Sequence, residues 1–128
     1  MLQFMMGSWV SQCIGAAARL DLADHLASGP KNAAELARLS GANADAVFRL
    51  MRALASIGIF TMAGDRFSLT PLSETLRTGV PGSMRNIAIM ETDEAHWLSW
   101  GKFSDSIRRG RKMSAEALQM EVWEYYGK

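Results

Sequence analysis

With 128 residues, of which 48% are hydrophobic and 21% charged, the chain has the size and balance of one globular domain and lacks the profile of a disordered protein. Fourteen Lys and Arg residues against thirteen Asp and Glu residues leave a net charge of +1, which argues against a domain-wide electrostatic grip on nucleic acid or on an anionic membrane. The single cysteine permits no internal disulfide and the two histidines do not by themselves supply a zinc site, so composition indicates a reducing, cytoplasmic compartment and no metal.

The N-terminal segment predicts a helix with two faces to bury. It carries no charge from Met1 to Ala18, but Gln, Gly and Ser residues interrupt it and no basic cluster follows, so no membrane span is expected. Its apolar arc covers about half of the helix circumference and consists of Leu2, Met5, Met6, Trp9, Val10, Cys13, Ala16, Ala17 and Leu20. Opposite this arc, Gly7, Ser11 and Gly15 recur every four residues beside Phe4. We expect these four residues in a homodimer interface; a helix central to its own fold is the alternative.

The middle of the chain predicts a winged helix-turn-helix. Asn32 can cap a helix that has Glu35 as its third residue, and a turn separates it from a second helix that ends at Gly58. The β-prone runs 59–62 and 66–69 flank a three-residue connection with a glycine, which predicts a hairpin.

Further helices are predicted after the hairpin. Thr70 and Pro71 fit the cap and first position of a helix. From Met84 a helical pattern runs to Ile107, with a break in the acidic stretch where Thr92 is a plausible cap, and a last helical segment follows. The expected fold is therefore mainly α: a dimerisation winged-helix domain over 1–82 with an extra N-terminal helix, and a helical extension over 83–128.

The sequence shows no catalytic centre. It contains no glycine-rich nucleotide-binding motif. A winged helix is also a DNA-binding fold, so DNA binding is a candidate function. However, the net charge of Asp45, Arg49 and Arg52 on the helix that would enter the groove is only +1, so we expect no nucleic acid partner. A stand-alone winged-helix module that binds DNA or another protein is the alternative function.

Several runs carry a resemblance to a known family. In chain order, Trp9–Gln12, Leu20–Leu26, Ala34–Ala37 and Phe48–Phe60 resemble the N-terminal dimerisation domain of small-molecule O-methyltransferases, which include bacterial polyketide-tailoring, plant caffeate and flavonoid, and acetylserotonin enzymes. The similarity continues in the family's order over essentially the whole chain, in the runs Phe67–Leu72, Val80–Ser83, His96–Gly101 and Trp123–Tyr126.

The resemblance implies a module that intertwines with its twin and helps to cover the acceptor-substrate pocket. In the family, methyl transfer takes place in a following Rossmann-like domain, which holds S-adenosylmethionine on a glycine-rich loop and supplies a histidine base. The sequence ends where the linker into that domain would begin. We therefore expect no catalytic residue and no bound cofactor in this chain, which alone should be inactive, with S-adenosylmethionine implied for the full-length enzyme.

The resemblance also implies substrate-lining positions, which are Met90, Glu91, His96, Val122 and Tyr126. They would form one wall of a pocket for a small aromatic acceptor with a hydroxyl group. Two departures affect this wall: Trp123 replaces the family's Phe, and the stretch 112–119 lacks the usual proline and phenylalanine. The alternative is that the five positions are core and helix-capping residues.

Overall fold

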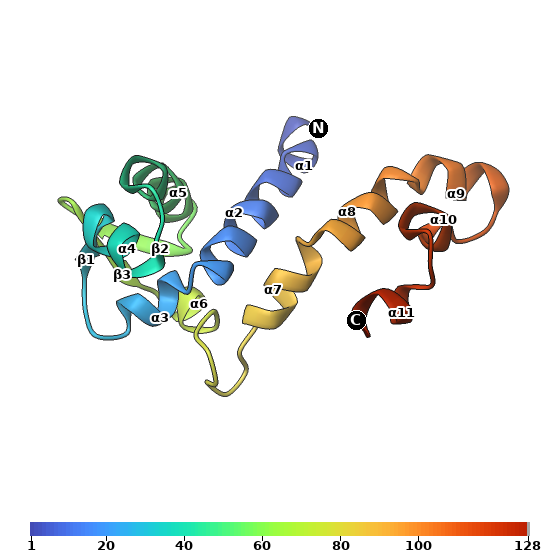
Figure 1. Ribbon diagram of the computed structural model, residues 1–128. Coiled ribbons are helices and arrows are strands. Elements are labelled where there is room, and N and C mark those ends of the chain that lie inside the picture. The colour runs from blue at the N-terminus through green and yellow to red at the C-terminus, as the bar shows by residue number, and fades with distance from the viewer. Residues whose placement is uncertain (128) are drawn as a thin grey trace. The chain divides into compact units, whose positions relative to one another are not determined.

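The computed structural model describes residues 1–127 and divides into two compact units, residues 1–89 and 90–128. Figure 1 traces the elements along the chain. The helices of the first unit are α1 (Leu2–Met5), α2 (Gly7–Arg19), α3 (Leu22–Leu26), α4 (Ala33–Ser40), α5 (Ala44–Ser56), α6 (Pro71–Glu74) and α7 (Arg85–Glu91). The last two residues of α7 belong to the second unit. Its strands are β1 (Lys31–Asn32), β2 (Phe60–Ala63) and β3 (Arg66–Leu69). The second unit contains α8 (Glu94–Gly101), α9 (Phe103–Arg109), α10 (Ser114–Leu118) and α11 (Val122–Tyr126).

The N-terminal helix is split into α1 and α2 by the single residue Met6. Only its C-terminal half is buried, through Gly15, Ala17 and Ala18, where α2 packs on α3 and α5. Large apolar side chains of its N-terminal half are exposed: Leu2, Phe4, Met5 and Trp9. Burial therefore divides this segment along its length and not between two faces: its C-terminal half is packed, and the apolar side chains of its N-terminal half are exposed.

The helix-turn-helix follows the predicted capping chemistry. The Asn32 side chain accepts a hydrogen bond from the Glu35 amide at 2.9 Å, and the Glu35 carboxylate accepts one from the Asn32 amide at 2.8 Å. This capping box satisfies two backbone amides that would otherwise lack partners at the start of α4. Gly41 ends α4 with a φ of 68°, a left-handed conformation that favours glycine, and Asn43 caps α5.

The hairpin is shifted slightly from the prediction. Its strands pair antiparallel, with Phe60 opposite Leu69 and Ala63 opposite Arg66. The connection is therefore Gly64–Asp65, one residue shorter than predicted, because Ala63 still pairs within the ladder. Two-residue connections suit the twist of antiparallel strands.

A third strand was not predicted. The order of the sheet is β1-β3-β2, with Lys31 opposite Phe67 and Asn32 opposite Arg66. Beneath this sheet, the side chains with the least exposure form one hydrophobic core, which comprises Leu22, Leu36, Val47, Met51, Leu54, Phe60 and Phe67. The core joins α3, α4 and α5 to the hairpin, so the mainly helical winged-helix prediction is confirmed.

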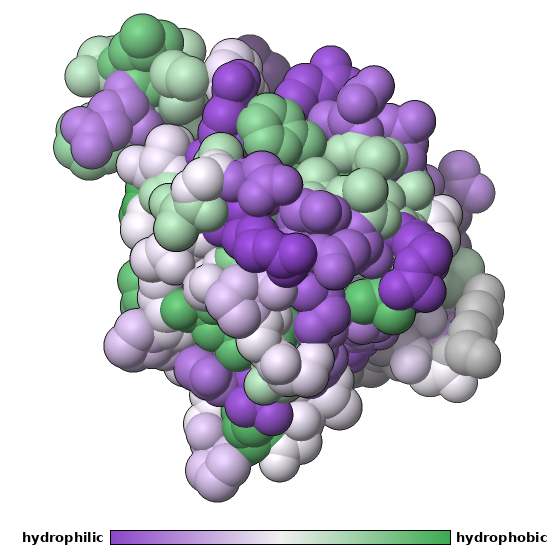
Figure 2. Space-filling view, turned by 90° about the vertical axis from the view of Figure 1, so that its left-hand side faces the viewer, coloured by the Kyte–Doolittle hydropathy of each residue, from purple (hydrophilic) through white to green (hydrophobic). Residues whose placement is uncertain are grey.

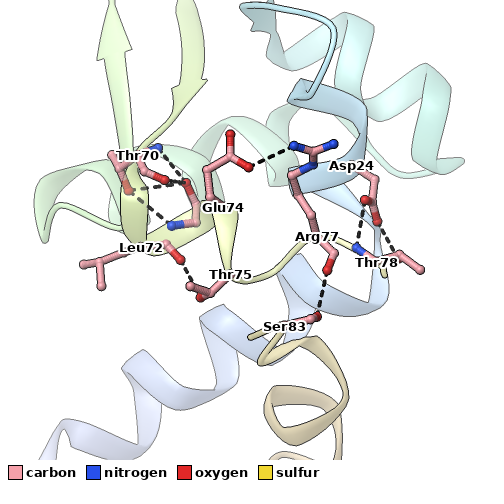
Figure 3. Close-up of polar contacts among 9 residues, drawn as sticks. Asp24, Thr70, Leu72, Glu74, Thr75, Arg77, Thr78 and Ser83 are labelled. Carbon is pink, nitrogen blue, oxygen red and sulfur yellow. Dashed lines mark hydrogen bonds and ion pairs between the residues drawn. The ribbon is translucent and has the colours of Figure 1, made fainter. Parts of the chain in front are cut away.

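The chain after the hairpin is tied back to the core by polar contacts (Figure 3). Thr70 caps α6 and donates from Oγ1 to the Ile59 carbonyl at 2.6 Å. Asp24 on α3 accepts from the amide of Thr78 at 2.9 Å and from its hydroxyl at 2.7 Å. On α6, which is four residues long, Leu72 is 59% exposed.

In the second unit, α8 packs against α10, with Ala95, Met113 and Leu118 buried. The cap of α8 is Asp93, whose Oδ1 accepts from the His96 amide at 3.0 Å. The prediction of Thr92 as the cap was wrong: Thr92 is buried and lies one residue before the cap, two before the first residue of the helix. None of the helices among residues 1–127 combines the length and apolar character needed to cross a bilayer.

Candidate functional site

A cavity of about 280 Å³ lies in the second unit, among α8, α10 and α11. Trp100, Leu118 and Val122 give it apolar walls, and His96 and Tyr126 bring polar groups to the same cavity. A mostly apolar pocket with a few convergent polar groups is the usual form of a small-molecule site. Three of the five predicted substrate positions, His96, Val122 and Tyr126, therefore line one cavity.

Three side chains of this site form a closed hydrogen-bonded cluster. Tyr126 donates its hydroxyl to Oδ2 of Asp93 at 2.8 Å, and Nδ1 of His96 lies 3.0 Å from that hydroxyl oxygen. The same Nδ1 lies 3.2 Å from Oδ1 of Asp93. Asp93 thus links residues 30 apart in the sequence, since its two oxygens reach both His96 and Tyr126.

This environment shifts the acidity of two groups. Burial, together with the hydrogen bond to the Asp93 carboxylate, raises the pKa of Tyr126 to about 12. For Asp93, burial by itself would raise the pKa, but hydrogen bonds from the His96 amide, the Tyr126 hydroxyl and the His96 ring outweigh it and bring the pKa below its usual value. At neutral pH the cluster therefore holds an ionised Asp93 beside a protonated Tyr126.

The other two predicted positions lie at the end of α7. Glu91 places Oε1 3.8 Å from Nε2 of His96, an ion-pair distance if the ring is protonated. Met90 is 40% exposed and is not among the residues that line this cavity. Asp93, in contrast, was not predicted as a site residue, although an aspartate just before a helix is a typical N-cap. Nothing in the sequence indicates its hydrogen bond with Tyr126.

The predicted dimer positions lie on α1 and α2. Phe4 is 85% exposed, and Gly7 and Ser11 are exposed as well, whereas Gly15 is buried within its own unit. A Cβ added at Gly7 would meet no atom within 4 Å, so the space beside it is open. Ser11 donates its hydroxyl to the Gly7 carbonyl at 3.2 Å, within the same helix.

Two apolar hollows flank α2. One, of about 260 Å³, lies between α2 and α5 and is lined by Trp9 and Val10 on one side and by Ala53 and Ile57 on the other. The second, of about 230 Å³, brings Ile14 of α2 together with Leu72 of α6 and Ile87 of α7. Of the exposed apolar residues of α2, Trp9 and Val10 thus line the first hollow.

The winged-helix face is not strongly basic. Figure 2 shows the side of the first unit that carries α4 and the hairpin, where hydrophilic residues dominate and apolar ones are scattered. Arg66 on the hairpin pairs with Glu35 at 3.2 Å, and Arg52 on α5 lies over the Phe48 ring, 5.7 Å from its centroid. Two of the cations available for phosphate contacts therefore already face groups of the chain itself.

The residues present do not fit S-adenosylmethionine. A Rossmann-type cofactor site needs a parallel strand that leads through a glycine-rich turn into a helix. The sheet within residues 1–127 is antiparallel throughout, so it offers no such turn. Nor does this part of the chain contain a group of three or more His, Cys, Asp or Glu residues placed to hold a metal ion.

Comparisons with known proteins agree with this architecture. The family model of the O-methyltransferase dimerisation domain matches residues 2–79. Phenazine O-methyltransferase PhzM of Lysobacter antibioticus is 36% identical across 100% of this chain and 38% of its own length. The crystal structure of LaPhzM superposes with a TM-score of 0.92 at 36% identity, over 98% of this chain and 38% of that one.

A further solved structure shows ligands. NcsB1, an O-methyltransferase from neocarzinostatin biosynthesis in complex with S-adenosylmethionine and 2-hydroxy-5-methyl naphthoic acid, superposes with a TM-score of 0.77 at 33% identity. The match covers 92% of this chain and 37% of NcsB1. The chain thus spans a little over a third of the length of the relatives it matches.

Proposed function

Because the chain belongs to the O-methyltransferase family through its dimerisation domain, we propose that it forms a homodimer and supplies acceptor-binding residues to an S-adenosylmethionine-dependent methyltransferase. Methyl transfer and cofactor binding belong, in this proposal, to a separate domain. The chain itself contributes assembly and one wall of the acceptor pocket.

The observation that carries the dimer is the uncovered apolar surface of α1 and α2. Phe4 and Trp9 are 85% and 65% exposed, on a helix pair flanked by two apolar hollows. A soluble monomer rarely exposes a contiguous apolar surface of this kind. In a two-fold dimer the same surface is used on both protomers, so one helix pair can cover its twin. Phe4, Gly7 and Ser11 are the positions proposed for this interface, whereas Gly15 is buried within its own unit and is not available to a partner.

The acceptor wall rests on the cavity of the second unit. Its apolar walls suit a flat aromatic ring, and His96 and Tyr126 can hydrogen-bond to ring substituents. The relatives support an aromatic acceptor, since one is named for a phenazine and another is in complex with a naphthoic acid. Met90 and Glu91, at the end of α7, are proposed as the edge of this wall, where a soft thioether can lie against a ring.

The acceptor wall can be tested in a chimera in which residues 1–127 replace the matching segment of the Lysobacter phenazine O-methyltransferase. Met90→Ala and Tyr126→Phe should raise the acceptor's KM or change acceptor preference, with the KM for S-adenosylmethionine nearly unchanged. This split is expected because the proposal assigns cofactor binding to the separate catalytic domain.

Matched control variants are available for both substitutions. Met62→Ala removes a methionine with the same 40% exposure as Met90, but on β2. Tyr125→Phe removes the hydroxyl of the neighbouring tyrosine. If Met90→Ala and Tyr126→Phe match the unmodified chimera across several phenolic acceptors, the proposed wall is wrong and these residues serve packing alone.

A further inference from the structure

In the cluster of Asp93, His96 and Tyr126, the groups around His96 determine which of its ring nitrogens carries the proton. A neutral imidazole has one N–H donor and one nitrogen acceptor, and its neighbours decide which is which. Nδ1 faces two oxygens, the Tyr126 hydroxyl at 3.0 Å and Oδ1 of Asp93 at 3.2 Å. Nε2 lies 3.8 Å from Oε1 of Glu91, which is beyond hydrogen-bond distance.

The protons available in the cluster determine which groups donate and which accept. The Tyr126 hydroxyl has a single proton, and its shortest contact is Oδ2 of Asp93 at 2.8 Å. An ionised carboxylate only accepts hydrogen bonds, and the low pKa of Asp93 keeps it ionised at neutral pH. Both oxygens that face Nδ1 therefore act as acceptors, so Nδ1 must be the donor. In the neutral ring, Nε2 is left without a proton.

We propose that Asp93 is a positioning residue that holds His96 in its Nδ1–H form, so that Nε2 accepts a hydrogen bond from a ring hydroxyl of the aromatic acceptor. Because His96 lines the cavity beside Val122 and Leu118, the preferred acceptor class is a hydroxylated aromatic with one hydroxyl in addition to the methylated one. This inference rests on the proposed function. The hydroxyl that His96 recognises is not the one that reacts, and no proton leaves it.

The tautomer can be measured directly in this chain by long-range nitrogen–proton NMR of the histidine rings. Only two histidines are present, so His25 serves as an internal reference for His96. We expect His96 to show a protonated Nδ1 and an unprotonated Nε2 at a pH where the ring is neutral. A His96 ring protonated at Nε2 would overturn the proposal, whatever the activity of the enzyme.

The substitution Asp93→Asn tests the effect of Asp93 on the His96 tautomer without removing the N-cap of α8. Asparagine is as good a helix cap as aspartate, so its amide oxygen can still accept from the His96 amide. Its amide nitrogen donates, however, which frees the Tyr126 proton to bond to Nδ1 and favours the Nε2–H tautomer. We expect this tautomer switch with the helical circular dichroism signal unchanged. A wild-type tautomer in Asp93→Asn would also overturn the proposal.

Acceptor preference gives the second readout, in the chimera described above. The probes are 2,7-dihydroxynaphthalene and 7-methoxy-2-naphthol, which lacks the second donor. We expect the unmodified chimera to favour the dihydroxy probe in kcat/KM by about tenfold, the usual effect of one hydrogen bond. Asp93→Asn should abolish this preference through KM, while the control Asp105→Asn, at a half-buried position on α9 that pairs with Arg108 and does not line the cavity, should retain it.

The tautomer and the acceptor preference distinguish failure of this inference from failure of the proposed function. If the tautomer is as expected but Asp93→Asn keeps the preference, His96 does not select the hydroxyl and the inference is wrong. If the unmodified relative is active and the correctly folded chimera methylates neither probe, the proposed function fails for this acceptor class, and the selection by His96 fails with it. The tautomer measurement then still decides whether Asp93 positions the ring.

Discussion

Replacing Trp9 with alanine should disrupt the dimer. Trp9 lies on α2, is 65% exposed, and lines the 260 Å³ hollow between α2 and α5. Tryptophan side chains that fill such hollows on a partner surface are among the strongest contributors to association. The substitution leaves the buried half of α2 untouched, because the buried residues begin at Gly15.

The expected magnitude follows from the exposed area. A tryptophan can bury up to about 250 Å², so an exposed fraction of 65% leaves about 160 Å² available. At about 25 cal/mol per Å², burial of half of that area is worth about 2 kcal/mol for each copy. A two-fold dimer carries the substitution twice, which gives about 4 kcal/mol in total. The dissociation constant should therefore rise by about a thousandfold.

Sedimentation equilibrium over a wide concentration range measures this constant directly. We expect the wild-type chain to be dimeric at micromolar concentration and Trp9→Ala to be monomeric there. Trp123→Ala is the matched control, since it removes an 86% exposed tryptophan from α11 in the second unit. A rise of less than tenfold for Trp9→Ala, or a wild-type chain that stays monomeric at every concentration, would refute the argument.

Four further outcomes are expected. Ser11→Leu should weaken association about tenfold by overfilling the space that a partner helix needs, and an unchanged dissociation constant would place the partner elsewhere. Calorimetry with S-adenosylmethionine should show no saturable heat from this chain alone; micromolar stoichiometric binding would contradict this. Gel shifts at about 150 mM salt should show only weak binding of DNA without sequence preference, whereas a nanomolar sequence-specific complex would favour a DNA-binding module. Because the pKa of Tyr126 is raised to about 12 in the folded chain, its contribution to the free energy of unfolding is complete below pH 10 and is lost as the pH rises towards 12; urea unfolding of Tyr126→Phe should lack this part of the alkaline decrease.

Local chemistry made much of the first unit predictable. The capping box of Asn32 and Glu35 and the cap at Thr70 depend only on residues close in the sequence, and both form as expected. The two-residue strand β1 carries no periodicity, so only its pairing with β3 reveals it. The break at Lys102 between α8 and α9 likewise lacks a proline or glycine at the break itself.

The site was predictable only in part. Family resemblance, not residue pattern, singled out His96, Val122 and Tyr126, and the three line one cavity. That they contact substrate stays a prediction. Thr92 and Asp93 are both ordinary N-cap residues, so the sequence did not distinguish them. In the folded chain Asp93 caps α8, and its second oxygen accepts from Tyr126, 33 residues later, a contact that the sequence does not indicate.

Under the proposed function, the bonds of Asp93 couple the stability of a helix to the selectivity of the acceptor pocket. The carboxylate that begins α8 is the same one that holds the Tyr126 hydroxyl. A substitution at position 93 chosen to admit a different ring therefore also weakens the start of α8, unless the new residue is itself a cap, such as asparagine or serine. Val122 lines the same cavity without a side-chain capping bond, so altered selectivity at that position carries no such penalty. If the cavity binds the acceptor as proposed, a change of acceptor through the apolar walls therefore costs less helix stability than one through the polar cluster.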